Sequence, residues 1–324
     1  MANKQKQKYV LVTGCAGFIG SNFVEVFKRR FPKIQVVGID NFATGRRERV
    51  AKDITFYEGS ICEPEFLERI FERHKPQYVF HFAALPRVSF SLEQPAETTR
   101  VNIYGTVLLL EKARDHKVKR FIYSSSSSLY GGAKKLPTKE SENPPNPISP
   151  YAIQKYAGES FCQSFSNLFG LDTICLRYFN VFGPGQFGDS AYSTVVSAWL
   201  EGLYFPTHKD LFIEGDGSQS RDFCYVDNVV EANIKAMWAP GRLTGAAINV
   251  AHGERTNLRE VKKLIEAYTG KILKLKQKPP RLGDVKHTHA DISKARKLIG
   301  YQPKVKFAKG LERTVAWFEG RLKS

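Results

Sequence analysis

Short apolar runs alternate with segments of helical length from Tyr9 to about Asn180, and this alternation constrains the fold more than any other feature of the chain. The apolar runs are YVLVT, VVGID, ITFYEG, YVFHFAA, RFIYSS and DTICLRYF, and helices are predicted near 21–30, 64–74, 96–116 and 151–169. Continuous apolar runs are typical of parallel strands that helices cover on both faces. The sequence therefore predicts an α/β fold with a doubly wound parallel sheet.

The pattern changes after Asn180, where glycine, proline and aromatic residues become frequent, as in NVFGPGQFG and LYFPTHKD. A chain of 324 residues is long enough for one large domain or two unequal ones. We expect residues 1–179 to form a dinucleotide-binding lobe. We expect 180–324 to form mainly a second, smaller α/β substrate lobe, with segments that return to the first.

The composition narrows the classes of partner. The net charge of +17 favours an acidic ligand, but the basic residues are scattered and accompany no nucleic-acid motif, so we do not expect a nucleic-acid partner. No apolar run approaches the ~18 residues of a membrane span. The five cysteines form no C-x-x-C pair, which predicts free thiols in the cytoplasm. His287 and His289 lack further ligands at suitable spacing, so we expect no metal site.

The stretch VTGCAGFIGS places Gly14, Gly17 and Gly20 between the first strand and the first helix. Glycines there let the backbone approach a pyrophosphate, and the helix N-terminus stabilises its charge. Asp40 ends the second strand, where a carboxylate accepts hydrogen bonds from ribose hydroxyls and repels a 2′-phosphate. This pattern predicts NAD, and not NADP, as the cofactor.

Tyr151 and Lys155 form a Tyr-x-x-x-Lys pair directly after Pro150. Proline suits the first turn of a helix, so the two side chains lie one turn apart on one face. A tyrosine titrates near ~10, and a neighbouring ammonium favours its phenolate. The pair therefore predicts a general base near the cofactor.

The stretch FIYSSSSSLYGG ends the fifth predicted strand in five serines and contains no acid. With the segments TGCAGFIGS, DNFATG, HFAA, SPYAIQK, LRYFNVFGP, GDGSQSRDFCYVDN and RLGDVKHTHAD, it resembles the extended short-chain dehydrogenase/reductase family. Within that family the chain is similar to the nucleotide-sugar epimerases and dehydratases, and the matching segments span nearly the whole chain. The resemblance implies a Rossmann fold, tightly bound NAD and a homodimer that pairs the helices near 96–116 and 151–169.

The resemblance also implies a set of cofactor-binding residues. They are Gly14, Gly17, Phe18, Ile19, Gly20, Asp40, Asn41, Ser60, Ile61, Phe82, Ala83, Ala84, Asn102, Ser124, Tyr151, Lys155 and Tyr178.

The resemblance implies roles for the serine run and for the Tyr-x-x-x-Lys pair. Ser126 would hydrogen-bond the 4-hydroxyl of the sugar, Tyr151 would take its proton, and Lys155 would hold the nicotinamide ribose. Ser127 and Ser128 stand where the 4,6-dehydratases carry Asp and Glu. A serine hydroxyl cannot replace that acid/base pair at neutral pH, so the resemblance favours 4-epimerisation of a UDP-sugar over loss of water.

The substrate residues implied by the resemblance are Arg87, Ser126, Asn180, Arg221, Arg281, Asp284 and Thr288. Thr288 stands where related epimerases carry a bulky tyrosine when they are restricted to glucose and galactose, so a small residue predicts room for an N-acetyl group. Arg87 replaces a serine of the N-acetylhexosamine epimerases and would favour an acidic hexose. Three hypotheses remain: an epimerase of neutral or N-acetylated UDP-hexoses, a UDP-uronate epimerase, and a catalytically silent dinucleotide-binding protein with a protein or nucleic-acid partner.

Overall fold

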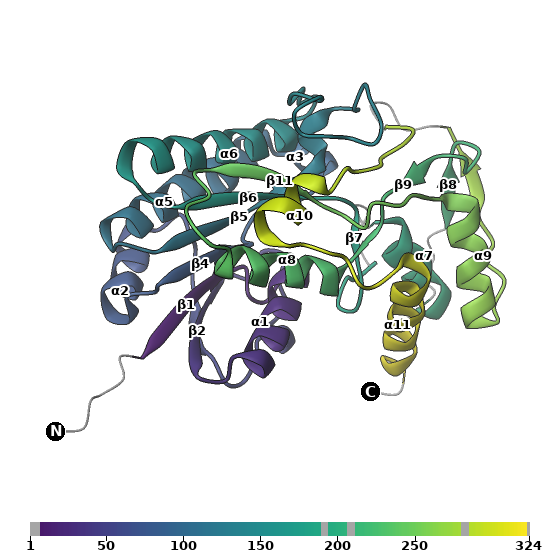
Figure 1. Cartoon of the computed structure of the whole chain (residues 1–324). Coiled ribbons are helices and arrows are strands. Elements are labelled where there is room, and N and C mark those ends of the chain that lie inside the picture. The colour runs from purple at the N-terminus through teal and green to yellow at the C-terminus, as the bar shows by residue number, and fades with distance from the viewer. Residues whose placement is uncertain (1–6, 189–193, 206–210, 280–284, 323–324) are drawn as a thin grey trace.

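A seven-stranded parallel sheet organises the larger lobe of the computed structural model (Figure 1). The structure describes residues 7–188, 194–205, 211–279 and 285–322. The strand order is β11-β6-β5-β4-β1-β2-β3. The strands are β1 (Lys8–Thr13), β2 (Ile34–Asp40), β3 (Thr55–Glu58), β4 (Tyr78–His81), β5 (Arg120–Ser126), β6 (Thr173–Tyr178) and β11 (Ala246–Val250). The predicted doubly wound α/β fold is confirmed.

Strand β1 shows why the apolar runs are continuous. Val10 and Val12 join the core on one face of the sheet, whereas Leu11 joins the core on the other. At its end, Thr13 lies opposite Ile39 of β2 and His81 of β4. Because all the strands are parallel, their carboxyl ends meet at one edge of the sheet, where ligands of such folds bind.

Helices cover both faces of the sheet. On one face lie α1 (Phe18–Arg30), α8 (Val226–Trp238) and α10 (Ser293–Ile299). On the other lie α2 (Pro64–His74), α5 (Thr106–Asp115) and α6 (Pro150–Phe169). The helix predicted near 96–116 is a helical run in three parts, namely α4 (Pro95–Thr99), the π-helical turn η2 (Arg100–Gly105) and α5.

Strand β11 was not among the strands predicted from the sequence. Its residues AAINV follow the long irregular region after Asn180 and pair only with β6, at the edge of the sheet. Because the strand is short and half-buried at its start, its pattern is weaker than that of the central strands. The sheet therefore includes residues from the second half of the chain, and so do its covering helices α8 and α10.

The smaller lobe contains short strands paired two by two and a separate apolar core. Its strands are β7 (Val181–Phe182), β8 (Phe212–Glu214), β9 (Ser220–Arg221), β10 (Cys224–Tyr225), β12 (Thr256–Asn257) and β13 (Lys276–Lys278). Its helices are α7 (Val195–Tyr204), α9 (Leu258–Thr269) and α11 (Phe307–Gly320), which lie together at one end of the molecule (Figure 1). Among the described residues, we find no helix with the length and apolarity needed to cross a bilayer.

Candidate active site

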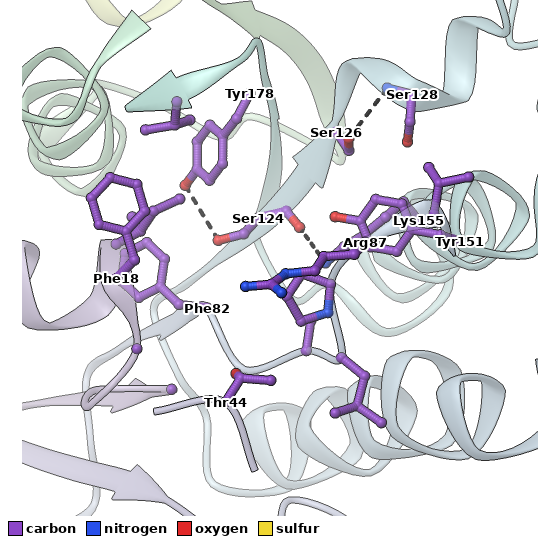
Figure 2. Close-up of a pocket in the computed structure, with 18 of the residues that line it drawn as sticks. Phe18, Thr44, Phe82, Arg87, Ser124, Ser126, Ser128, Tyr151, Lys155 and Tyr178 are labelled. Atoms are coloured by element: carbon purple, nitrogen blue, oxygen red, sulfur yellow. Dashed lines mark hydrogen bonds between the residues drawn. The ribbon is translucent and has the colours of Figure 1, made fainter. Parts of the chain in front are cut away.

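A cavity of about 1100 Å³ lies at the carboxyl edge of the sheet, where the strands face the smaller lobe (Figure 2). Cations outnumber carboxylates among its described lining residues. The charged lining residues are Asp40, Glu97, Arg46, Arg49, Arg87, Lys155 and Arg221. This excess of positive charge suits ligands that carry phosphates. Both carboxylates are already engaged, because Asp40 accepts from backbone N–H groups and Glu97 pairs with Arg100.

The glycine-rich turn forms one wall of this cavity. Gly14 has a φ of +70°, and a Cβ there would lie 2.7 Å from the backbone nitrogen of Ala83. A Cβ at Gly20 would lie 2.1 Å from the carbonyl oxygen of Gly14. Helix α1 therefore begins directly against the turn. Its N-cap is Gly17, which has no side chain to cap the helix, so the first backbone N–H groups remain for an anionic ligand.

Asp40 fixes the neighbouring loops through both carboxylate oxygens. Oδ2 accepts a hydrogen bond from the N–H of Ala16 at 2.9 Å, and Oδ1 accepts from the N–H of Phe42 at 2.8 Å. The side chain is buried at the end of β2 beside the cavity. Each oxygen keeps a further lone pair for a ribose hydroxyl, whereas a 2′-phosphate would meet its charge. The turn and this carboxylate together fit NAD.

The predicted cofactor residues gather around the same cavity. Every one of them lines it except Asn102. The buried amide of Asn102 instead exchanges two hydrogen bonds with the backbone of Leu85, and it also donates to Gln154. Asn102 therefore holds the segment that follows Ala83 and Ala84, and it is not exposed to the cavity.

The serine run changes conformation at Ser126. Strand β5 ends there and a 3₁₀ turn, η3 (Ser127–Tyr130), begins, with the Oγ of Ser126 accepting from the N–H of Ser128 at 3.2 Å. Ser126 and Tyr151 both line the cavity, and the Ser126 hydroxyl lies close enough to lower the pKa of the Tyr151 phenol. Helix α6 starts with Ser149 as its N-cap and Pro150 in its first turn, which aims Tyr151 and Lys155 into the cavity (Figure 2). The three predicted catalytic residues are therefore brought together.

Burial shifts the titration of both members of the Tyr-x-x-x-Lys pair. Burial raises the pKa of Tyr151 to about 12, and the nearby Ser126 hydroxyl opposes this rise. Burial lowers the pKa of Lys155 to about 8. Tyr151 in the cofactor-free protein is therefore a neutral phenol at neutral pH. Bound NAD supplies a hydride acceptor and, in its oxidised form, a positive charge that favours the phenolate.

Lys155 is held in a defined position. Its ammonium donates to the carbonyl oxygen of Ser124 at 2.8 Å and lies 5.0 Å from the ring centroid of Tyr123 and 5.9 Å from that of Tyr151. The buried ring of His81 is hydrogen-bonded to Thr13 and Thr106. Burial, with a smaller effect of Lys155, lowers the pKa of His81 to about 3, so that imidazole is neutral. The positive charge beside Tyr151 therefore belongs to Lys155.

A buried ion pair supports the serine run from behind. Ser125 donates to Glu159 at 2.6 Å, and Glu159 pairs with Arg177 at 2.7 Å, with each side chain 6% exposed. Arg177 also donates to the hydroxyl of Tyr130 at 2.7 Å. An acid thus contacts the run from α6, although the run contains none. Glu159 does not line the cavity, so it supports the site without reaching a substrate.

The predicted substrate residues of the smaller lobe are joined by hydrogen bonds. The hydroxyl oxygen of Thr288 accepts from the side-chain amide of Asn180 and from the N–H of Asp222, both at 3.0 Å. Arg221 lines the cavity and donates to the carbonyl oxygens of Ser220 and Lys286 at 3.1 Å. Asn180, Arg221 and Thr288 therefore share one end of the cavity. Arg281 and Asp284 lie outside the described residues.

Asp222 is the residue that organises this end. Its carboxylate accepts from the backbone N–H groups of His252 at 3.0 Å and of Gly253 and Ala290 at 3.1 Å. It therefore fixes two loops that are distant in sequence, at 252–253 and at 290, to its own segment. Burial raises the pKa of Asp222 to about 7, and these N–H groups oppose the rise. Sequence reasoning missed this role, since Asp222 was read only as part of a segment that matches the family.

The match to a family decides the general identity of this site. Residues 10–251 match the sequence pattern of the NAD dependent epimerase/dehydratase family. The chain belongs to this family. The resemblance read from the sequence and the prediction of NAD are both confirmed.

Three similar proteins of the epimerase family illustrate the range of sugars. The UDP-glucose 4-epimerase of Thermotoga maritima, solved with UDP-glucose, is 39% identical with a TM-score of 0.91, covering 97% of this chain and 99% of its own. A UDP-N-acetylglucosamine 4-epimerase of Methanobrevibacter ruminantium, solved with UDP-N-acetylmuramic acid, is 36% identical with a TM-score of 0.89, covering 98% and 99%. A UDP-glucuronate 4-epimerase of Thermodesulfobacterium geofontis is 33% identical over 95% of each chain.

Two signals for the missed residues were present in the sequence. Glu159 follows Lys155 by four positions, so it shares the helix face that carries the Tyr-x-x-x-Lys pair. Arg177 is the one charged residue within the apolar part of DTICLRYF, and a buried arginine needs an anionic partner. Neither signal identifies its partner, because Glu159 and Arg177 meet only after α6 packs on β6.

The two histidines considered as metal ligands make separate contacts. His287 bonds to Ser220 at 2.9 Å, and His289 bonds to the carbonyl oxygen of Gly253 at 3.1 Å. Within the described parts of the chain, no three His, Cys, Asp or Glu side chains form a group that could hold a metal.

Proposed function

We propose that this member of the epimerase family interconverts the C4 epimers of a UDP-hexose with NAD, and that it accepts N-acetylated sugars at least as well as UDP-glucose. The similarity to 4-epimerases acting on three kinds of UDP-sugar supports the reaction type. The choice of sugar depends on Thr288 in the smaller lobe and on Arg87 in the sheet lobe, and it is the finer part of the proposal.

The observation that carries the proposal is that Ser126, Tyr151 and Lys155 lie together in the cavity. The two carboxylates among the described lining residues, Asp40 and Glu97, are bonded to backbone N–H groups and to Arg100. The proton of the sugar 4-hydroxyl passes to Tyr151 while C4 gives up a hydride, for which bound NAD would supply the acceptor, and C4 becomes a ketone. Ser126 orients the oxygen, and Lys155 favours the phenolate that accepts the proton. After the ketone rotates in the cavity, the hydride returns to its other face and Tyr151 gives the proton back.

This sequence of steps breaks no carbon–oxygen or carbon–carbon bond of the sugar. Elimination of water would need an acid and a base beside the sugar, and Ser127 and Ser128 present hydroxyls there. We therefore expect the product to have the mass of the substrate.

The test is incubation of the purified protein with UDP-glucose, UDP-N-acetylglucosamine and UDP-glucuronate, each in a separate reaction. The products are separated by chromatography and weighed by mass spectrometry. A C4 epimer of unchanged mass from at least one substrate supports the proposal. A 4-keto-6-deoxy product, lighter by one water, would overturn it.

A UDP-uronate is the second candidate substrate, and Arg87 favours it. Arg87 has a φ of +90°, which is strained for a residue with a side chain. Its guanidinium points into the cavity between Ser124 and Phe82 (Figure 2). A strained arginine in a ligand cavity suits an anionic group. Preferential turnover of UDP-glucuronate in the same incubations would favour this candidate.

We propose the remaining substrate contacts by the same resemblance. Arg221 and Arg281 would pair with the diphosphate, Asp284 would accept from the uridine ribose, and Asn180 and Thr288 would border the sugar. The shared hydrogen bonds of Asn180 and Thr288 support the last pair.

We also propose a cytoplasmic homodimer. The five cysteines are free and buried, which suits a reducing compartment. Helix α6 exposes apolar side chains that a second copy would cover. They are Ile153, Tyr156, Phe161, Leu168 and Phe169. Light scattering after gel filtration tests the dimer, which predicts twice the mass of one chain.

A further inference from the structure

Residues 183–188, here called the strap loop, follow β7 and cross from the smaller lobe to the cofactor side of the cavity. Gly185, Gln186 and Phe187 line the cavity together with Asp40 and the residues that follow it. None of the strap loop was predicted to take part in the site. Its contacts explain how the two lobes are joined around the cofactor.

Two guanidinium groups approach the ring of Phe187. The Cζ of Arg46, from the loop after β2, lies 3.5 Å from the ring centroid. The Cζ of Arg321, just after α11, lies 4.7 Å from it. Cations over an aromatic face are attracted by its quadrupole, and more strongly where water is excluded. Phe187 therefore connects the cofactor loop to the C-terminal helix.

The far side of the strap loop is anchored rigidly. The two carboxylate oxygens of Glu201 in α7 accept hydrogen bonds from the guanidinium of Arg321 at 2.8 and 3.0 Å. Glu201 also accepts from the N–H of Gly188 at 3.1 Å. The Glu201 side chain is 8% exposed. A buried bidentate pair has a fixed geometry, so Arg321 and the end of the strap loop have little freedom.

The near side of the strap loop is fastened to the start of α1. Asn22 donates to the carbonyl oxygen of Pro184 at 2.9 Å. Arg49 donates to Ser21 at 2.8 Å and lies against Gly185, where a Cβ would come within 1.4 Å of its Nη1. Gly185 also has a φ of +83°, so the position favours glycine for two reasons.

We infer that Phe187 retains the cofactor, because NAD can leave its end of the cavity only if the strap loop separates from residues 40–49. The strap loop and residues 40–49 close over the cofactor end of the cavity. Phe187 of the strap loop and Arg46 of residues 40–49 make the side-chain contact between these two segments. Phe187 is thus a positioning residue that acts through Arg46. The inference rests on the NAD cofactor and holds whichever sugar is epimerised.

The test measures exchange of bound cofactor in the holoenzyme. Protein purified with NAD is mixed with excess isotope-labelled NAD, and the ratio of unlabelled to labelled nucleotide is followed over time by mass spectrometry after denaturation. Phe187→Ala is expected to exchange roughly tenfold faster than the parent, from the typical strength of a partly desolvated cation–π contact. Phe187→Leu separates the cation–π contribution from packing and is expected to exchange faster than the parent as well.

Phe205→Ala is the matched control. The Cζ of Arg321 also lies 4.2 Å from the ring centroid of Phe205, but Phe205 does not line the cavity. This variant loses an arginine–aromatic contact of the same kind away from the cofactor, and we expect it to exchange at the parental rate. An equal acceleration in Phe205→Ala would overturn the inference, since any loss of packing around Arg321 would then suffice.

A double-mutant cycle keeps the inference testable if Phe187→Ala does not fold. Arg46 lies in a loop and its side chain is 37% exposed, so Arg46→Gln is expected to disturb the fold less than Phe187→Ala. The cycle combines Arg46→Gln with Phe187→Leu. If Arg46 and Phe187 retain the cofactor through their mutual contact, the double variant exchanges NAD no faster than the faster of the two single variants. If the two substitutions multiply each other's effect on the exchange rate, or if Arg46→Gln leaves the exchange rate unchanged, the contact does not retain the cofactor.

Discussion

The sheet lobe and the smaller lobe present their functional groups in different ways. In the sheet lobe, Ser126 and Asp40 stand at the ends of long strands, and α6 holds Tyr151 and Lys155 through a helical turn. In the smaller lobe, Asn180, Arg221 and Thr288 stand in loops or in a two-residue strand. Hydrogen bonds made by the side chains of Asp222 and Thr288 connect these segments.

We therefore propose that the sheet lobe carries the chemistry and that the smaller lobe, together with Arg87 of the sheet lobe, selects the substrate. Groups fixed by a sheet keep their geometry when the ligand changes, which suits proton and hydride transfer to any sugar. Groups fixed by a few loop contacts tolerate exchange of one side chain, which suits changes in specificity. Substitutions at Ser126, Tyr151 or Lys155 should therefore change the rate for all substrates, and substitutions in the smaller lobe should change the ranking of the substrates.

Tyr151→Phe should have the largest effect, because it removes the proposed base of the sheet lobe. Loss of a general base typically lowers turnover about 10²–10⁴-fold. Affinity for UDP-sugar should change little, since the hydroxyl acts in the transition state. Turnover and UDP-sugar binding, measured separately, check both parts. A variant within a few-fold of the parental rate on any sugar would show that the base is another group.

Arg177→Met should cause the largest loss of stability, since it leaves Glu159 charged and buried without its partner. Breaking such a pair typically costs about 3–5 kcal/mol. Urea unfolding of the cofactor-free protein measures the change. Arg259→Met is the control in the smaller lobe, where the pair with Asp216 is exposed and no loss is expected. Similar losses in both variants would remove the contrast between the lobes.

The pH dependence of stability should report the burial of Lys155. Its pKa is lowered to about 8, whereas an unfolded lysine titrates near ~10.4. Between these values the unfolded chain binds the extra proton, so this residue's contribution to stability rises with pH, by up to about 1.4 kcal/mol per pH unit. The measurement is the difference in unfolding free energy between the parent and Lys155→Met, both without cofactor. A difference that stays constant from pH 8 to 10 would place the ammonium in a hydrated site.

Thr288→Tyr should have the smallest effect on overall rate and should change selectivity. Tyrosine would fill space beside the sugar and clash with an N-acetyl group, and pocket contacts of this kind discriminate about 10–200-fold. The ratio of turnover with UDP-N-acetylglucosamine to that with UDP-glucose checks it. Thr288→Val is the control for loss of the hydroxyl, which also bonds to Asn180. Equal losses on both sugars in Thr288→Tyr would mean that Thr288 does not border the sugar.

The sequence by itself determined the parts of this protein that depend on local spacing. The strand runs, the glycine turn, Asp40 and the pair of Tyr151 and Lys155 could be read directly, because their partners lie within one strand or one helical turn. The order of these segments also predicted that they share one edge of a parallel sheet. The predicted chemistry of the serine run came from the resemblance to epimerases and dehydratases, and its place at this edge agrees with that prediction.

Only the tertiary structure decided which distant residues meet. It joined β11 to β6, paired Glu159 with Arg177, and placed Asp222 on Ala290, a residue 68 positions away. It also brought Arg46 onto Phe187. No periodicity encodes such contacts, because each depends on how whole helices and loops pack against one another. The sequence thus supplied the proposed reacting groups, and packing decided which residues hold them and which residues surround the cavity.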